Sequence, residues 1–293
     1  MFDYRLKVFY TVALRLSFTK AAAELNISQP AVTKHIKEIE HQLNTKLFNR
    51  NGTTIQLTES GTALFDYAEK IRNLSRDLEF SISQLNNKKT GKLKIGASTT
   101  IAQYILPEIL AKFKVRYPEI SLELVTHNTE DISALLKKGR IDFGLVEGDS
   151  QSSLFEYTVF KADEIVLVCK ADHSLADKTL KLSDLPNIGL VVREQGSGTQ
   201  EFIQNQLKKS GVEPQSLKIE MQLGSSESLK NYLLHSECMA FLSLNTMLQE
   251  LKNKQLSVVK IKNFSIKRNF HFITLKGEQS EMIHLFQKFV SYN

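Results

Sequence analysis

The sequence predicts a mostly α/β protein preceded by a small helical module. Three observations support this prediction. The first 58 residues contain three short amphipathic segments and a hairpin pattern. The segment from Thr62 to Lys89 contains neither Gly nor Pro and predicts one long helix. From Lys92 onward, apolar strand-like runs alternate with helical spacing, which is typical of sheets covered by helices. At 293 residues the chain is long enough for two or three domains.

Positive charge is concentrated at the N-terminus. Residues 1–58 carry eight basic and four acidic side chains, whereas residues 59–293 carry 30 and 28. Two-thirds of the net charge of +6 therefore lies in the first fifth of the chain. This asymmetry favours an N-terminal module that meets phosphate. An ordinary solvated face would give the same count, so charge alone leaves both interpretations open.

The first 58 residues predict three helices and a hairpin. Residues 4–16 form the first helix, and Thr19 predicts the N-cap of a second over 20–25, which Asn26 can end in the left-handed conformation. Ser28 predicts the cap of a third helix over about 30–43, with Pro30 in its first turn. This helix–turn–helix order precedes a hairpin wing that turns at Asn51–Gly52. We expect the buried face of the third helix to comprise Val32, Ile36, Ile39 and Leu43.

The long helix carries apolar residues three or four positions apart, close to a coiled-coil seam. This spacing favours a dimerisation helix over an ordinary helix that faces its own core. A polar linker over 86–91 follows it. The seam residues are Leu64, Tyr67, Ile71, Leu74, Leu78, Ile82 and Leu85.

The remainder predicts two similar α/β subdomains with parallel sheets. Expected strands cover 93–97, 121–126, 143–146, 165–169, 189–192, 218–222, 240–242, 256–261 and 270–275. Expected helices cover 105–117, 132–138, 199–209, 226–234, 246–252 and 280–290.

Composition excludes several classes of protein. The cysteines, Cys169 and Cys238, are too few for a disulfide-stapled scaffold or a four-cysteine zinc site. Cys169 lies in an apolar run, so we expect an inert core thiol rather than half of a redox switch. The histidines show no metal-ligand spacing. No apolar run reaches the roughly 20 residues of a membrane span, and no signal-peptide core is present. We therefore expect a cytoplasmic protein without membrane contact, metal or cofactor.

The N-terminal sequence SFTKAAAELNISQPAVTKHIKEIEHQLNTKLFNR, followed by TTIQLTESG, closely resembles the DNA-binding domain of LysR-type transcriptional regulators. The downstream organisation is similar as well, so the resemblance spans essentially the whole chain. Two positions depart from the family pattern. Asn44 stands where glycine is usual, but asparagine also tolerates the left-handed conformation. Ile39 replaces a leucine of equal volume.

The resemblance implies a winged helix-turn-helix DNA-binding domain over 1–58 and a dimerisation helix over 59–89. It also implies an effector-binding domain over 90–293 with a fold like that of periplasmic binding proteins. Its first subdomain would cover about 92–161 and 269–293, and its second about 162–268. The implied partners are double-stranded promoter DNA, a small-molecule effector and further copies of the chain, usually in a tetramer. RNA polymerase is a further candidate partner.

Candidate DNA-binding residues lie around the third helix, whose N-terminal end enters the major groove in such proteins. The Gln29 amide can pair with adenine, and Pro30 and Thr33 can contact a thymine methyl. The basic residues Lys34, Lys37 and Arg50 suit phosphate or groove contacts. Thr19 and Ser28 suit phosphate contacts, with helix capping alone as the alternative.

Candidate effector-binding residues follow strands and open helices, where α/β folds bind anions. Their hydroxyls and backbone amides suit a small carboxylate or another oxyanion. Each is individually more typical of a plain N-cap, and the case depends on their convergence. The residues are Ser98, Thr99, Thr100, Thr129, Gln195, Gly196, Ser197, Gly198, Thr199, Ser225 and Ser226. The segment from His235 to Met239 lacks the glycines usual in the family, which leaves details of this site open.

Two other classes of protein compete with a regulator. An enzyme built on the α/β domains is disfavoured because no nucleophile elbow, P-loop or dinucleotide fingerprint is present. A small-molecule-binding protein with an accessory dimerisation arm leaves the winged module unexplained. The sequence therefore predicts a DNA-binding regulator that is not an enzyme.

Overall fold

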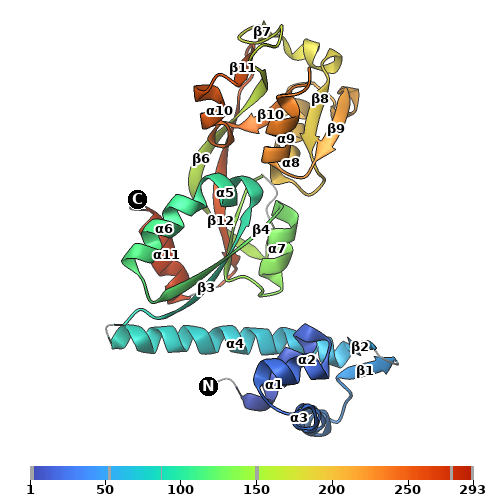
Figure 1. Ribbon diagram of the computed structural model, residues 1–293, viewed down its shortest axis with the longest axis vertical. Helices are drawn as coiled ribbons and strands as arrows, with labels where there is room; N and C mark the ends of the chain where they lie inside the picture. The colour runs from blue at the N-terminus through green and yellow to red at the C-terminus, as the bar shows by residue number, and fades with distance from the viewer. Residues whose placement is uncertain (1–2, 52–53, 87, 149–151, 278–279, 292–293) are drawn as a thin grey trace. The chain divides into compact units, whose positions relative to one another are not determined.

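The computed structural model describes residues 3–51, 54–86, 88–148, 152–277 and 280–291. The chain forms two compact units, residues 1–91 and residues 92–293 (Figure 1). Each unit has its own buried core. The two units are therefore described separately.

The first unit is a three-helix module with a hairpin and a long helix. Its elements are α1 (Tyr4–Arg15), α2 (Phe18–Leu25), α3 (Gln29–Gln42), β1 (Phe48–Asn51), β2 (Thr54–Leu57) and α4 (Glu59–Leu85). Strands β1 and β2 pair antiparallel as the predicted wing. The predicted turn at Asn51–Gly52 includes Gly52, which lies outside the described residues.

The capping residue of α2 differs from the prediction. Ser17, not Thr19, is the N-cap, and its side chain accepts a hydrogen bond from the Lys20 backbone N–H. The helix begins earlier because Phe18 is buried in the module core, which brings Thr19 into the first turn. The left-handed C-cap at Asn26 is confirmed, with φ of 54°.

Helix α3 begins after the predicted Ser28 cap and buries Val32, Ile36 and Ile39. Leu43 was expected to be buried, but it is the C-cap and is 50% exposed. The helix ends there because Asn44 is left-handed, with φ of 47°, which turns the chain away before Leu43 can pack. The left-handed conformation expected of Asn44 is thus confirmed.

Helix α4 is capped by Thr58, and its first turns pack Phe65 and Ala68 into the module core. Leu64 is partly buried against the same core. The other six seam residues form an exposed apolar stripe and are between 42% and 84% exposed. They are Tyr67, Ile71, Leu74, Leu78, Ile82 and Leu85.

The second unit is a two-lobed α/β structure. Its strands are β3 (Gly91–Ser98), β4 (Ile120–His127), β5 (Phe143–Val146), β6 (Phe155–Lys170), β7 (Thr179–Leu180), β8 (Leu190–Arg193), β9 (Ile219–Leu223), β10 (Ala240–Ser243), β11 (Leu256–Ile261) and β12 (Ile266–Leu275). Its α-helices are α5 (Thr99–Tyr104), α6 (Leu106–Arg116), α7 (Thr129–Lys137), α8 (Gly198–Lys209), α9 (Ser226–Leu233), α10 (Leu248–Lys252) and α11 (Glu281–Ser291). Three short 3₁₀ helices cover Leu182–Asn187, Pro214–Ser216 and Leu244–Thr246.

The large sheet is mixed, not parallel as predicted, whereas β8 and β9 pair parallel in a separate two-stranded sheet. The path order is β4-β3-β5-β12-β6-β11-β7, with β10 also paired to β6. Strands β3 and β5 run parallel, but β12 is antiparallel to both β5 and β6. Residues 156 to 164 mix charged with apolar side chains and lack a continuous apolar run, so the predicted strand began ten residues late at Ile165.

Strands β6 and β12 run through both lobes and join them (Figure 1). We call lobe I the part with β3–β5, α5–α7 and α11, and lobe II the part with β7–β11 and α8–α10. Lobe I packs Ile132, Leu136 and Ile273 into its core. In the described part of the chain, no helix is long and apolar enough to span a membrane.

Candidate DNA interface and interlobe site

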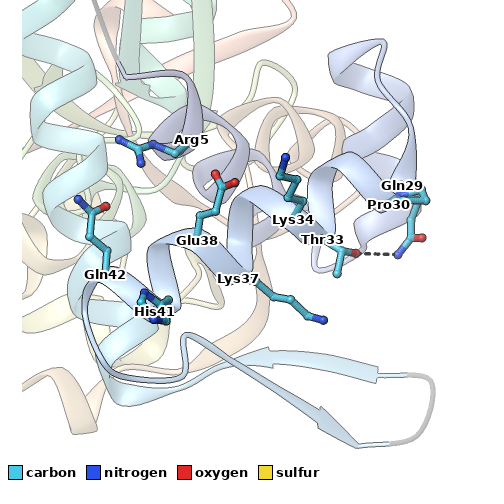
Figure 2. Close-up of a pocket in the computed structure, with 9 residues that line it drawn as sticks. All are labelled: Arg5, Gln29, Pro30, Thr33, Lys34, Lys37, Glu38, His41 and Gln42. Carbon is cyan, nitrogen blue, oxygen red and sulfur yellow. Dashed lines mark hydrogen bonds between the residues drawn. The ribbon is translucent and has the colours of Figure 1, made fainter.

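A groove of about 960 Å³ runs along the exposed face of α3. Five predicted DNA-binding residues line it: Gln29, Pro30, Thr33, Lys34 and Lys37. Arg5 from α1 adds a further cation, and Glu38 is the acidic residue in its lining (Figure 2). The groove is therefore net positive, as a surface that meets phosphate must be.

Gln29 and Thr33 form a pair one turn apart at the N-terminal end of α3 (Figure 2). The Gln29 Nε2 donates to the Thr33 Oγ1 at 3.0 Å, which restricts the exposed amide to one orientation. An amide nitrogen carries two hydrogens. One N–H and the carbonyl oxygen of Gln29 therefore remain for the two-point contact that adenine offers.

The other predicted DNA-binding residues lie outside this groove lining. Ser28 caps α3 by accepting from the Ala31 N–H at 3.3 Å, so the capping role weighed for it is present. Thr19 is exposed on α2, and Arg50 lies on wing strand β1. The backbone of α3 thus positions one compact set of residues, with Thr19 and Arg50 on separate elements.

The helices predicted to carry the effector site meet at the junction of the two lobes. Helices α5 and α7 begin in lobe I, and α8 and α9 begin in lobe II (Figure 1). Ser98, Thr100, Thr199 and Ser226 are all buried. The predicted convergence of hydroxyls from both lobes is therefore present in the structure.

Arg193 links a hydroxyl of lobe I to a hydroxyl of lobe II. It ends strand β8, and its side chain is 2% exposed. Its Nη2 donates to the Thr99 Oγ1 of lobe I at 2.9 Å, and its Nη1 donates to the Ser226 Oγ at 3.4 Å. The carboxylate of the next residue, Glu194, accepts from Nε at 2.8 Å and from Nη2 at 3.0 Å.

A second arginine lies deeper in the junction. Arg268 of β12 pairs with Glu147 at 2.7 Å and with Asp163 at 2.8 Å, and it donates to the Thr199 Oγ1 at 3.0 Å. Thr199 in turn donates to Glu147. Burial alone would raise the pKa of Glu147, but the Arg268 guanidinium and the Thr199 hydroxyl outweigh it and lower that pKa. Glu147 is therefore a buried, ionised carboxylate that joins the lobes.

The backbones of the lobes approach closely at two glycines. Gly196, with φ of 83°, accepts from the Glu130 N–H at 3.3 Å. A Cβ on Gly198 would lie 2.2 Å from the Glu147 carbonyl oxygen and 2.5 Å from the Thr129 Oγ1. Both glycines thus permit contact between protein segments here, rather than approach of a ligand to an open loop.

Several predicted effector residues serve as structural caps. Ser197 caps α8 by accepting from the Gln200 N–H, and Ser225 caps α9 by accepting from the Ser228 N–H. Thr129 does not cap α7, since Asn128 does so, and Thr129 instead donates to the Glu147 carbonyl at 3.2 Å. Gln195 is exposed.

Tyr104 of α5 makes a further link between the lobes. Its hydroxyl donates to Glu227 of α9, and Lys230 lies 4.9 Å from the centre of its ring. Burial, with the Glu227 carboxylate, raises the pKa of the Tyr104 hydroxyl above its usual range. The phenol therefore stays protonated and keeps donating across the junction at ordinary pH.

Sequence reasoning missed Arg193, Glu147 and Arg268. A usable signal was present for two of them. Glu147 directly follows the buried run FGLV, and Arg193 ends the run GLVVR, so each charge sits at the carboxyl end of a strand. Arg268 gave no such signal, because it stands in the polar run Lys267–Asn269, just before the predicted strand over 270–275.

Cys169 is fully buried, and burial raises the pKa of its thiol to about 11. It belongs to a different core cluster from the one that Cys238 packs against. Among the residues that the structure describes, no group of three or more His, Cys, Asp or Glu could hold a metal ion.

Comparison with known proteins identifies the architecture. The family model described as "Bacterial regulatory helix-turn-helix protein, lysR family" matches residues 4–62, and the model "LysR substrate binding domain" matches residues 86–292. The chain belongs to the LysR family. It is a DNA-binding transcriptional regulator with an effector-binding domain, and not an enzyme.

Individual relatives agree with this membership. The HTH-type transcriptional regulator CysL of Bacillus subtilis (strain 168) is 35% identical over 269 residues, which cover 92% of this chain and 89% of CysL. The structure of full-length CbnR complexed with its target DNA has a TM-score of 0.70 at 20% identity and covers 98% of both chains, which shows the shared fold. The regulatory domain of Synechocystis PCC6803 CcmR in complex with 2-PG has a TM-score of 0.61 at 27% identity. It covers 69% of this chain and 94% of that one.

Proposed function

We propose that this regulator recognises its operator through the N-terminal end of α3, with Gln29 contacting a base directly. The observation that carries the proposal is the Gln29–Thr33 hydrogen bond on an exposed, positively charged groove. A side chain held in one orientation loses little freedom on binding, so its contacts favour the matching base. Lys34 and Lys37 would contact phosphates on either side of it.

The test uses an operator recovered by selection from random DNA with the wild-type protein. We expect Gln29→Ala to weaken operator binding by about 1–3 kcal/mol per bidentate contact, measured by gel-shift titration. Gln249→Ala, an exposed residue of α10 outside the groove, is the matched control and should bind nearly as the wild type does. Unchanged affinity of Gln29→Ala for the operator would refute base contact by this residue.

We further propose that the effector is a small carboxylate or another oxyanion, bound where the two lobes meet. The buried Arg193 guanidinium, with the Thr99 and Ser226 hydroxyls, supplies the donors that such a group needs. The CcmR regulatory domain in complex with 2-PG supports a small-molecule ligand for this type of domain.

A thermal-shift screen of small carboxylates and phosphates would identify a ligand for calorimetry. We expect Thr99→Ala to bind that ligand more weakly, because the hydroxyl that accepts from Arg193 and can donate to the ligand is removed. Thr179→Ala, an exposed residue of β7, is the control. Full retention of binding by Thr99→Ala would count against Thr99 as part of the site.

We also propose that the exposed stripe on α4 pairs two copies of the chain, and that such dimers join into tetramers. The stripe has six exposed apolar residues with heptad-like spacing, and a second helix packed against it would bury them. Sedimentation should show that Leu74→Glu combined with Leu78→Glu yields monomers at concentrations where the wild type associates. Leu154→Glu, equally apolar and exposed but outside α4, should leave assembly unchanged.

A further inference from the structure

The Arg193 guanidinium already holds a carboxylate, and that carboxylate belongs to the chain itself. Glu194 engages Nε and Nη2 through two different oxygens, at 2.8 and 3.0 Å. This two-point geometry is the one in which a guanidinium binds a free carboxylate. The position that an external oxyanion would take on this face of Arg193 is thus filled by a neighbouring side chain.

The two partners differ in how firmly they are held. The Arg193 side chain is 2% exposed and is fixed from both lobes by Thr99 and Ser226. The Glu194 side chain is 26% exposed, so it can rotate into water without opening the core. Its backbone N–H stays bonded to the Leu223 carbonyl at 3.2 Å, which means that only the side chain needs to move.

Arg268, by contrast, holds carboxylates that surface motion cannot release. Its guanidinium pairs with Glu147, whose side chain is 3% exposed, and with Asp163, whose side chain is fully buried. Arg268 therefore keeps two anionic partners in every arrangement of surface side chains. Arg193 has one partner carboxylate at the surface, and release of that carboxylate leaves a single positive charge facing Thr99 and Ser226.

We propose that Glu194 is a tethered competitor of the effector. Its carboxylate occupies the oxyanion position on Arg193 in the free protein, and an anionic effector binds by displacing it. The inference rests on the proposed effector site between the lobes. It assigns Arg193 as the residue that recognises one carboxylate or phosphate oxygen pair, and Glu194 as the residue that sets how much effector is needed.

The experiment measures binding of acetate and of inorganic phosphate to the full chain by thermal unfolding. Each salt is titrated against sodium chloride at equal ionic strength. We expect Glu194→Gln to half-saturate at about tenfold lower anion concentration than the wild type. In the wild type only the fraction of molecules whose Glu194 has left Arg193 can bind the anion, and the apparent affinity falls in proportion to that fraction. Arg193→Gln should show no anion-dependent shift. Glu220→Gln removes a carboxylate from an exposed lobe II ion pair and should match the wild type.

Glu194→Asp keeps the charge but shortens the side chain, so it should fall between Glu194→Gln and the wild type. It also carries the test if Glu194→Gln does not fold. A response that appears in Glu194→Gln but not in the wild type at the same concentrations also supports the proposal. The relative response to acetate and phosphate shows whether the displaced carboxylate stands in for a planar or a tetrahedral group.

Two results would overturn the inference in distinguishable ways. If Arg193→Gln loses a response that the wild type shows, while Glu194→Gln binds no more tightly than the wild type, the site binds anions but Glu194 does not compete. If folded wild type and folded Glu194 variants show no response to either anion, both this inference and the proposed oxyanion site fail.

Discussion

Contact between the lobes at Gly198 can be tested by adding one methyl group. A Cβ there would lie 2.2 Å from the Glu147 carbonyl oxygen, 2.5 Å from the Thr129 Oγ1 and 2.8 Å from the Glu147 carbonyl carbon. Two of these three atoms are backbone and cannot rotate away. Gly198→Ala therefore forces the start of α8 and the end of β5 apart by on the order of 1 Å, the shortfall from an ordinary contact distance.

Overpacking of this kind costs about 1–3 kcal/mol. For a unit of about 200 residues, each kcal/mol lowers Tm by roughly 2–4 °C. We therefore expect Gly198→Ala to lower the Tm of lobe unfolding by about 2–12 °C in calorimetry. The same displacement pulls Thr199 away from Glu147, so the pKa of Glu147 should move back toward its usual value and acid should remove less of the stability.

Gly224 provides the matched control. It also lies in lobe II just before a helix, but a Cβ at this position meets no atom within 4 Å and its φ is not in the left-handed region. Gly224→Ala should leave Tm unchanged or raise it by up to about 4 °C. Equal Tm values for Gly198→Ala and Gly224→Ala would refute the view that the lobes are in close backbone contact.

Three further outcomes follow from named contacts. Thr58→Ala should lower the free energy of unfolding of the N-terminal module by about 1 kcal/mol in urea titration, because it removes the α4 cap that accepts from Gly61 at 2.9 Å. Lys37→Ala should reduce the slope of log K against log salt for operator binding by about 0.9 per phosphate lost, with sequence preference kept. Because the pKa of Glu147 in the folded state lies below its usual 4.5, its stabilisation is present above pH 4.5 and is lost as pH falls through the folded value. Glu147→Gln should therefore flatten the acid side of the stability curve below the usual value of 4.5, and an unchanged curve would contradict this assignment.

The sequence predicted the N-terminal module well because its signals are local. Ser28, Asn26 and Asn44 act through their own backbone geometry, so each cap or helix end could be inferred from a few neighbours. The error at Leu43 came from the backbone turn at Asn44, whereas the error at Thr19 arose where packing decided between adjacent residues. Phe18 is drawn into the core and shifts the helix start, a choice that depends on residues far along the chain.

The sheet and the interlobe site were harder to predict because they depend on long-range pairing. The direction of β12 relative to β5 and β6 follows from how distant strands meet, and alternation of residues carries no information about direction. The hydroxyls beside helix starts were predicted to converge. In the structure Thr99 and Ser226 meet at Arg193, and Thr199 contacts Arg268 and Glu147. The charges that connect them were missed, because the partner of Arg268 lies 121 residues away at Glu147.

The chemistry of the junction explains how one fold can hold its lobes together and still respond to a ligand. An apolar junction would gain stability with every contact and would leave an anion no favourable place to bind. A junction made of Arg193, Arg268 and their carboxylates gains less, since desolvation of each charge offsets much of the attraction between partners. An external oxyanion that replaces Glu194 therefore exchanges one ion pair for another at small net cost. The same exchange returns a solvated carboxylate to the surface and places the external anion on Arg193 Nη2, the atom that also contacts Thr99, so occupancy would be felt in the other lobe.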